Sequence, residues 1–309
     1  MIQLIKRRVV GASALLILAS IFCFLLVIAA PGNVAILIAE QRSGTVTVEA
    51  VKKVEEDLGL NDPIPVRYGR WLVGAVQGDL GVSLRTGEDI VIGFAKRLPQ
   101  TGMLLLGAGL IAIVVGLGLG YLGAVWPGTA LDNGIRAIGV FGVSVPTFFV
   151  GILLILVFGV VLSWLPTFDD GTLRSWILPW ITLGIFPGCL LSRVVRVSLE
   201  DIMARPFIIT STSKGFASGH ILVRDATPNL VPILVTSFGT QFGVLIFTTV
   251  VVEPLFSIHG VGYYFIEAAK FRDFTVVQAC LLLFSTFFIV LNTVVDIVAM
   301  SLDPKVRRA

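Results

Sequence analysis

Six long apolar runs constrain the fold of this 309-residue chain more than any other feature of its sequence. They cover residues 9–30, 103–126, 137–162, 176–195, 231–252 and 276–300. Each reaches or exceeds the roughly 18 residues at which an apolar stretch indicates a membrane span. Backbone groups inside a bilayer find no water, so each run must satisfy its own hydrogen bonds as a helix. The sequence therefore predicts an all-α, polytopic membrane protein with six transmembrane helices.

The composition excludes an ordinary soluble protein, since only 14% of the residues are charged against about 25% in typical globular domains. Cys23, Cys189 and Cys280 all lie within apolar runs, where cysteine acts as a small apolar residue. The two histidines, His220 and His259, are far apart in sequence and form no paired metal-binding motif. No metal site is predicted.

The distribution of Lys and Arg predicts the orientation in the membrane. With the N-terminus inside, the inner segments contain twelve of these residues and the short outer loops contain three. Because cytoplasmic loops carry the excess of positive charge, both termini are predicted to be cytoplasmic. A cleaved signal peptide is the alternative for the first run, but that run is longer than the about 7–15 apolar residues of a signal sequence.

The outer segment between the first two runs, residues 31–97, is predicted to contain structure of its own. Thr47 can cap a helix whose apolar residues recur at helical spacing: Val48, Val51, Val54 and Leu58. Gly59 then suits the end of that helix. The following stretch, DPIPVRYGRWLVGAVQGDLGVSL, is predicted to form a compact, partly interfacial cap. An amphipathic segment lying on the outer membrane surface is the alternative.

The motifs of several chemistries are absent from the sequence. It contains no nucleotide-binding phosphate loop, no G-x-S-x-G and no H-E-x-x-H. The stretch GLGYLG, residues 118–123, matches G-x-G-x-x-G, but it lies inside a predicted span. Together with Gly116 and Gly120, these glycines indicate close packing of helices.

Four residues that interrupt the apolar runs are candidates for a substrate pathway, namely Ser144, Pro146, Gln241 and Asp296. An intramembrane carboxylate such as Asp296 has by default a functional or bundle-facing role. A hydrogen-bonded group near the inner interface is an equal alternative for Asp296. Pro146 should kink the third span, which can either line a pathway or ease packing.

The longest inner loop, about residues 198–228, reads as two short helices with a glycine hinge. The first helix follows Pro206, with Phe207 and Ile208 on a narrow apolar side, and ends at Gly215 in a left-handed conformation. The second covers about 218–224 and is capped by Ser218, and Pro228 and Pro232 are predicted to mark the turn into the fifth span. Small side chains here let another protein approach closely, although a plain polar connection is the alternative.

The stretch TSTSKGFASGHILVRDATPNLVP, residues 210–232, resembles the cytoplasmic loop of binding-protein-dependent ABC importers. The resemblance is strongest to the dipeptide permease B-like members of the dipeptide, oligopeptide and nickel permease family. It extends along the chain through LGLNDPIPVRYGRW, GDLGVS, RLPQT, EPLFSIHGVG, RDFTVVQ and SLDPKVRR. Three positions depart from the family pattern, namely Ile209, Asp225 and His259.

The resemblance implies a type I ABC importer permease fold with a large outer loop between the first two helices. Residues 1–96 would form the first helix and an extracytoplasmic loop domain, 97–302 the core permease and 303–309 a cytoplasmic tail. The loop would couple to a separate ATPase through Phe207, Thr210, Ser211, Lys214, Gly215, Phe216 and Ala217. The chain itself would be non-catalytic and without a cofactor, because the ATPase would bind ATP and Mg²⁺.

The implied location is the prokaryotic cytoplasmic membrane. The implied partners are a second homologous permease subunit, the ATPase, an extracytoplasmic substrate-binding protein and the lipid bilayer, with no nucleic acid. The implied cargo is a dipeptide or oligopeptide. A gradient-driven carrier or channel is the alternative function, but it would need ionisable residues along several spans. An intramembrane hydrolase would need a Ser–His pair in the bilayer, and both histidines lie in loops.

Overall fold

The computed structural model describes residues 2–29, 35–36, 39, 47–57, 59 and 61–302. The predicted tail at 303–309 and most of the segment 30–46 lie outside these residues. Within the described part, the secondary structure is helical apart from one isolated bridge between Val82 and Asp89. Five helical stretches are long and apolar enough to cross a membrane: Lys6–Ala29, Ile90–Val125, Leu173–Met203, Ser218–Leu255 and Phe274–Leu302. The all-α prediction is confirmed.

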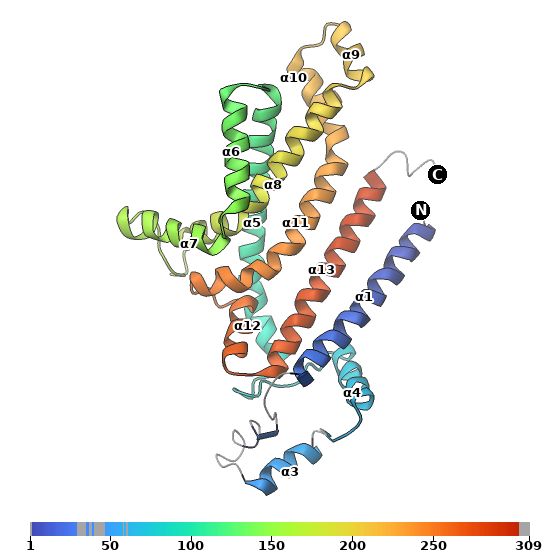
Figure 1. Ribbon diagram of the computed structural model, residues 1–309, viewed down its shortest axis with the longest axis vertical. Helices are drawn as coiled ribbons and strands as arrows, with labels where there is room; N and C mark the ends of the chain where they lie inside the picture. Colours follow the sequence, from blue (N-terminus) through green and yellow to red (C-terminus); the bar gives the residue numbers. More distant parts are fainter. Residues whose placement is uncertain are drawn as a thin grey trace.

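Helix α5 (Ile90–Val125) packs along α8 (Ile177–Met203), and α11 (Thr227–Leu255) packs against α8. Helix α13 (Phe274–Leu302) lies on α11, and α1 (Ile2–Ala29) lies on α13 at the edge of the bundle. The first residues of α1 and the last residues of α13 lie toward the end of the bundle that carries α9 (Pro206–Ser213) and α10 (Ser218–His220), whereas α12 (Val261–Lys270) lies at the other end (Figure 1). The two ends therefore differ in the elements they present.

Small residues hold α5 and α8 together. A Cβ atom added at Gly116 would overlap the Leu191 side chain, and one at Gly120 would overlap Val195. Glycine at these positions permits the backbones to approach closely, as in other membrane helix pairs. The packing interpretation is confirmed for Gly116 and Gly120, whereas a Cβ atom at Gly118 would meet no atom within 4 Å.

The third apolar run differs from the single kinked helix that was predicted over 137–162. It is divided into α6 (Ala130–Ser144) and α7 (Thr147–Leu154), the latter continuing as η1 (Ile155–Val161). Pro146 has φ −59° and ψ 135° and stands before the first turn of α7. Proline offers no N–H to α6 and disfavours helical geometry in the residue before it, which is compatible with a kink or an end, and here α6 ends. Helix α7 projects sideways from the bundle (Figure 1).

Helix α5 begins well before the predicted start of the second span at residue 103. The Asp89 carboxylate accepts hydrogen bonds from the N–H groups of Val91 (2.8 Å) and Ile92 (3.1 Å), and so caps the helix. Pro99 lies inside the helix. The predicted boundary between residues 96 and 97 therefore falls within one continuous helix, because the capping signal at Asp89 precedes the apolar run.

The outer segment contains α3 (Val48–Asp57) and α4 (Ile64–Val76). Thr47 Oγ1 accepts a hydrogen bond from the Ala50 N–H at 3.2 Å, and Gly59 has a φ of +58°, which confirms the predicted ends of this helix. Leu58 lies outside the described residues.

Helix α4 rests on the end of α1. Tyr68 and Ser20 share a hydrogen bond of 2.8 Å between their hydroxyl groups, and Tyr68 packs edge-on against Phe24, with ring centroids 5.5 Å apart. The Trp71 ring lies 5.8 Å from that of Phe24. An aromatic cluster with polar edges is typical of the membrane interface, as was predicted for this stretch.

A buried carboxylate fastens the outer loop to the bundle. Asp273, only 3% exposed, accepts hydrogen bonds from Ser83 Oγ (2.5 Å) and from the Leu84 N–H (3.1 Å). It also accepts from the Val276 N–H at 3.4 Å, in the first turn of α13. One side chain thus caps α13 and holds a loop from a distant part of the sequence.

Candidate functional site

The candidate coupling site is the turn between α9 and α10. Arg205 is extended before Pro206, which opens α9, and Lys214 ends that helix. Gly215 follows with a φ of +81°, a left-handed conformation that favours glycine. Helix α10 then continues through η3 (Ile221–Ala226) into α11. Two helical segments with a glycine between them are therefore confirmed.

Two predicted details of this region are wrong. Ser218 is the first residue of α10, and Ala217, which has no capping side chain, stands before it. Pro228 and Pro232 do not mark a turn, because the helix runs unbroken from 218 to 255.

The helix has π-helical winding over η3, directly before Pro228. The Leu222 carbonyl accepts from the Thr227 N–H and also from Thr227 Oγ1, and the Asn229 side-chain amide donates to the Asp225 carbonyl, both side-chain bonds at 2.8 Å. Side chains thereby add hydrogen bonds to backbone carbonyls where the winding changes.

The α9–α10 turn is attached to the bundle by few side chains. Ile208 and Ile221 are 3% and 2% exposed and pack with Leu199 and Ile202 of α8. The predicted apolar side through Phe207 and Ile208 is only half correct, because Phe207 is exposed. The helix turns 100° per residue, so neighbouring residues cannot both face α8.

The predicted coupling residues surround this turn and mostly face outward. All but the half-buried Ser211 are exposed: Phe207, Thr210, Lys214, Gly215, Phe216 and Ala217. Phe216 stacks on His220 with ring centroids 5.1 Å apart. Together with the exposed Ile209, these residues present apolar side chains at the end of the bundle. Exposed aromatic and aliphatic groups of this kind mark surfaces that contact another protein.

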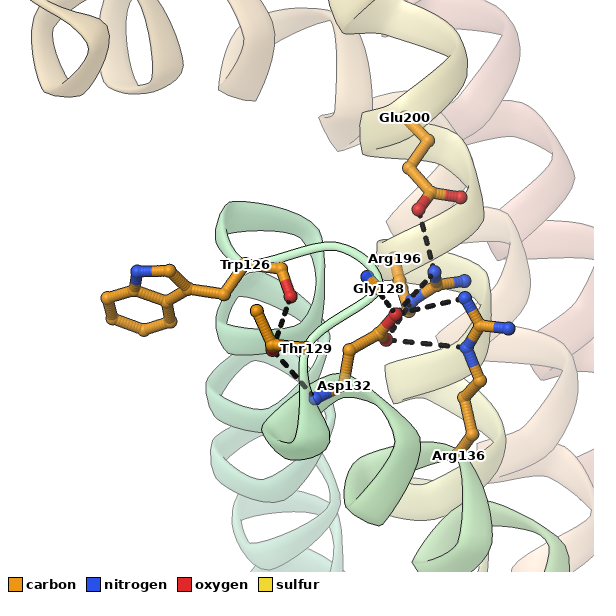
Figure 2. A network of polar contacts seen from close by, with 7 residues as sticks. All are labelled: Trp126, Gly128, Thr129, Asp132, Arg136, Arg196 and Glu200. Carbon is orange, nitrogen blue, oxygen red and sulfur yellow. Dashed lines mark hydrogen bonds and ion pairs between the residues drawn. The ribbon is translucent and has the colours of Figure 1, made fainter.

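A charged brace lies near the coupling site and joins the α5–α6 turn to α8 (Figure 2). The fully buried Asp132 carboxylate accepts hydrogen bonds from Arg196 Nε at 2.6 Å and Arg136 Nη2 at 2.9 Å. It also accepts from the Gly128 N–H at 3.0 Å. Arg196 Nη2 reaches Glu200 at 2.7 Å, on the turn of α8 that leads toward α9. The brace thus connects the base of the coupling loop with α6.

The Arg196 guanidinium, with the Gly128 N–H and Arg136, holds the pKa of Asp132 well below its usual range. For a carboxyl group shifted in this direction, the stabilisation is present above the unfolded pKa of about 4 and disappears only as the pH falls through the lower folded pKa. The brace is therefore ionised at neutral pH. Sequence reasoning missed Asp132, and the only local signal was Arg136 four residues further on.

Replacing Asp132 with asparagine should lower the thermal stability of the chain, because Arg196, only 12% exposed, would lose its buried charge partner. Thermal unfolding of the purified protein in detergent measures this. Asp201→Asn is the matched control, since Asp201 is an exposed acid on α8, the helix that carries Arg196. Equal melting temperatures for the two variants would contradict a stabilising brace.

The four predicted pathway residues lie on separate elements. Ser144 ends α6, Pro146 precedes α7, and Gln241 lies within α11. The side-chain oxygen of Gln241 is buried and has no hydrogen-bond partner among the described residues. Asp296 of α13 pairs with Arg8 of α1 at 2.6 Å, with the two side chains 30% and 55% exposed. This pair joins the edge helix to the bundle, which agrees with the interface alternative for Asp296.

A second buried acid also escaped sequence reasoning. Glu253, fully buried in the last turn of α11, accepts hydrogen bonds from Thr101 Oγ1 at 2.7 Å and the Tyr263 N–H at 2.8 Å. Thr101 Oγ1 in turn accepts from the Val261 N–H at 2.8 Å. The network joins α5, α11 and α12 at the end of the bundle opposite the coupling site.

No group of three or more His, Cys, Asp or Glu side chains suited to a metal ion occurs within the described ranges. The arrangement contains an exposed turn with apolar side chains and two polar braces.

The chain matches the family described as "Binding-protein-dependent transport system inner membrane component" over residues 112–308. Its first 104 residues match the N-terminal region of such membrane components. The chain belongs to this family. It is therefore a multi-pass inner-membrane permease subunit of an ABC importer, in which a separate subunit is the ATPase.

Among curated proteins, the glutathione transport system permease protein GsiC of Escherichia coli (strain K12) is 33% identical over 307 residues, covering 99% of each chain. GsiC of Shigella flexneri serotype 5b is 32% identical over the same length and also covers 99% of each chain. Similarity thus extends over the whole permease, including the outer segment.

Among solved structures, the inward-facing MetNI methionine ABC transporter matches with a TM-score of 0.58 at 18% identity. The match covers 68% of this chain and 96% of the other. At this identity the likeness concerns the fold, and it supports the type I importer architecture.

Proposed function

We propose that this permease imports dipeptides or oligopeptides, and that the exposed turn from Phe207 to Ala217 couples transport to a separate ATPase. The observation that carries the proposal is the geometry of that turn. Its apolar side chains project from the end of the bundle, and Gly215 sets the angle between its two helices. The ATPase would bind ATP and Mg²⁺, and this chain would need no cofactor.

The position of the turn supports a mechanical role. Helix α9 follows α8 directly, and α10 continues into α11 without a break. A displacement of the turn is therefore transmitted to two helices of the bundle. Because Arg196 ties α8 to Asp132, the push also reaches α6. A helix transmits such displacement because its hydrogen-bonded backbone is stiff along its axis.

The substrate class is inferred from the relatives, which are named as glutathione transport permeases. Glutathione is itself a small peptide, which favours peptides over other solutes. A second, homologous permease subunit would complete the pathway. An extracytoplasmic binding protein would deliver the cargo to the end of the bundle that carries α12 and the loop held by Asp273.

The excess of Lys and Arg at the coupling end supports an orientation in which both termini and the turn are cytoplasmic. The start of α1 and the end of α13 lie toward that end of the bundle (Figure 1).

Cysteine cross-linking in membranes that contain the whole transporter tests the coupling role. The native cysteines are all buried, so a cysteine at the exposed Ser213 is the principal target for a maleimide that carries a photoactivatable benzophenone, which reacts with C–H bonds of a neighbouring subunit. Ser213→Cys should cross-link to the ATPase subunit. Leu173→Cys, 68% exposed and predicted to lie on the opposite side of the membrane, is the control. Absence of a cross-link at 213 in a transporter that retains its ATPase would contradict the proposal.

A gradient-driven carrier makes a different prediction for uptake into vesicles. Import by the proposed mechanism requires ATP together with a binding protein. Uptake by this chain alone, driven by an ion gradient, would favour the carrier.

A further inference from the structure

A cavity of about 460 Å³ lies between α6 and α8. This volume is within the about 300–1,000 Å³ that is usual for binding sites of small molecules. Ile135 and Gly139 of α6 and Leu190 and Val197 of α8 give it largely apolar walls. Ser144, at the break between α6 and α7, is also part of the lining.

Three guanidinium groups line the same cavity, those of Arg136, Arg193 and Arg196. Arg136 and Arg196 are held in place by Asp132, and Arg196 also by Glu200. Arg193 is exposed and makes no hydrogen bond or ion pair with the part of the chain that the structure describes. Two carboxylates therefore oppose three guanidiniums, and one positive charge is left without a partner.

The combination of an apolar wall and an unpaired guanidinium suits an amphiphilic anion. Arginine binds phosphate groups through parallel N–H donors and is well suited to such sites. With the orientation proposed above, the cavity lies toward the cytoplasmic side of the membrane, where basic pockets between helices bind anionic lipid headgroups. Arg193 can reach the headgroup level while its methylene groups stay against the apolar wall.

We propose that this cavity binds an anionic phospholipid, with its phosphate at Arg193 and its acyl chain along the apolar wall. The inference goes beyond the proposed transport function and rests only on the proposed orientation. An inorganic phosphate or a peptide carboxylate shares the anionic group but lacks the acyl chain. The experiment must therefore separate a lipid from a free anion.

Gly139 and Gly134 offer a matched pair of variants. Both lie on α6, and a Cβ at either position would meet no atom within 4 Å. Only Gly139 lines the cavity, so Gly139→Leu should fill it without disturbing the packing, whereas Gly134→Leu should leave it open. Arg193→Gln removes the unpaired charge, and Arg174→Gln makes the same change at an exposed arginine that does not line the cavity.

Native mass spectrometry of the purified full-length chain, titrated with phosphatidylglycerol or phosphatidylethanolamine of identical acyl chains, measures lipid retention. We expect phosphatidylglycerol to be retained preferentially. Arg193→Gln should weaken that binding by about tenfold, the effect of losing one charge-assisted contact. Gly139→Leu should also weaken it, because the leucine side chain occupies the cavity. Gly134→Leu and Arg174→Gln should leave it unchanged.

Equal binding by all four variants, or no preference between the lipids, would overturn the proposal. So would displacement of phosphatidylglycerol by equimolar inorganic phosphate or an acidic dipeptide, which would assign the cavity to a free anion. None of these readouts depends on transport, so failure here is distinct from failure of the proposed function.

Discussion

Replacing Gly215 with aspartate is expected to abolish import while the chain still inserts into the membrane. Gly215 has a φ of +81°, and a residue with a Cβ pays about 1–2 kcal/mol to adopt this conformation. No atom lies within 4 Å of the position of that Cβ, so the effect arises from backbone strain together with the new charge on the exposed turn, and not from a clash. The turn would shift and its apolar residues would no longer present the same surface. Binding-protein-dependent uptake, compared with the amount of chain in the membrane, measures the effect.

Three further variants separate conformation from charge. Gly219→Asp adds the same charge within α10, where a side chain also meets no atom within 4 Å, and it should retain more uptake. Gly215→Asn should retain more than Gly215→Val, because asparagine tolerates the left-handed conformation and a β-branched residue does not. If Gly215→Asp imports at the wild-type rate, the turn does not couple transport to ATP hydrolysis.

Replacing Glu253 with alanine should destabilise the bundle strongly. The change removes both acceptors for Thr101 Oγ1 and the Tyr263 N–H and leaves space in a fully buried site. Unsatisfied buried donors and lost volume together cost about 2–4 kcal/mol. For a chain of this size that corresponds to a melting temperature lower by roughly 3–6 °C. Thermal unfolding in detergent, followed by tryptophan fluorescence, provides the measurement.

Two companion variants test whether the hydrogen-bond network is the cause. Glu267→Ala removes a 39% exposed acid of the neighbouring α12, which pairs with Arg85. This change should cost at most about 1 kcal/mol. Gly260→Ala should resemble Glu253→Ala, since the added Cβ would overlap the Glu253 carboxylate. A wild-type melting temperature for Glu253→Ala would show that the network contributes little to stability.

The two braces lie at opposite ends of the bundle and differ in chemistry. Asp132 and Arg196 form a charged pair beside the coupling site, whereas Glu253 bonds to a hydroxyl and a backbone N–H. The Asp132 carboxylate is as buried as that of Glu253, but its partner Arg136 is 54% exposed, so only the charged network reaches the surface of the bundle. This contrast suits a permease in which the coupling end moves more than the end that carries α12.

Local features of the sequence predict much of the coupling site. Helix α9 begins at Pro206, and Gly215 follows its last turn in a left-handed conformation. The spacing of these two residues predicts the length of the helix, because both act through backbone preferences of single residues. The same reasoning identified Pro146 as a disturbance in the third run. It did not show that the helix would end there, since kinked and broken helices have the same local sequence and differ in what packs around them.

Long apolar runs by themselves determined that the chain forms membrane-spanning helices, because the bilayer leaves the backbone no other way to satisfy its hydrogen bonds. Only the tertiary structure decided which polar groups meet. Asp132 and Arg196 are 64 residues apart in sequence, and Ser83 and Asp273 are 190 apart. A carboxylate accepts from whichever donor the packing brings within about 3 Å. That choice depends on the relative placement of whole helices, which no local pattern specifies.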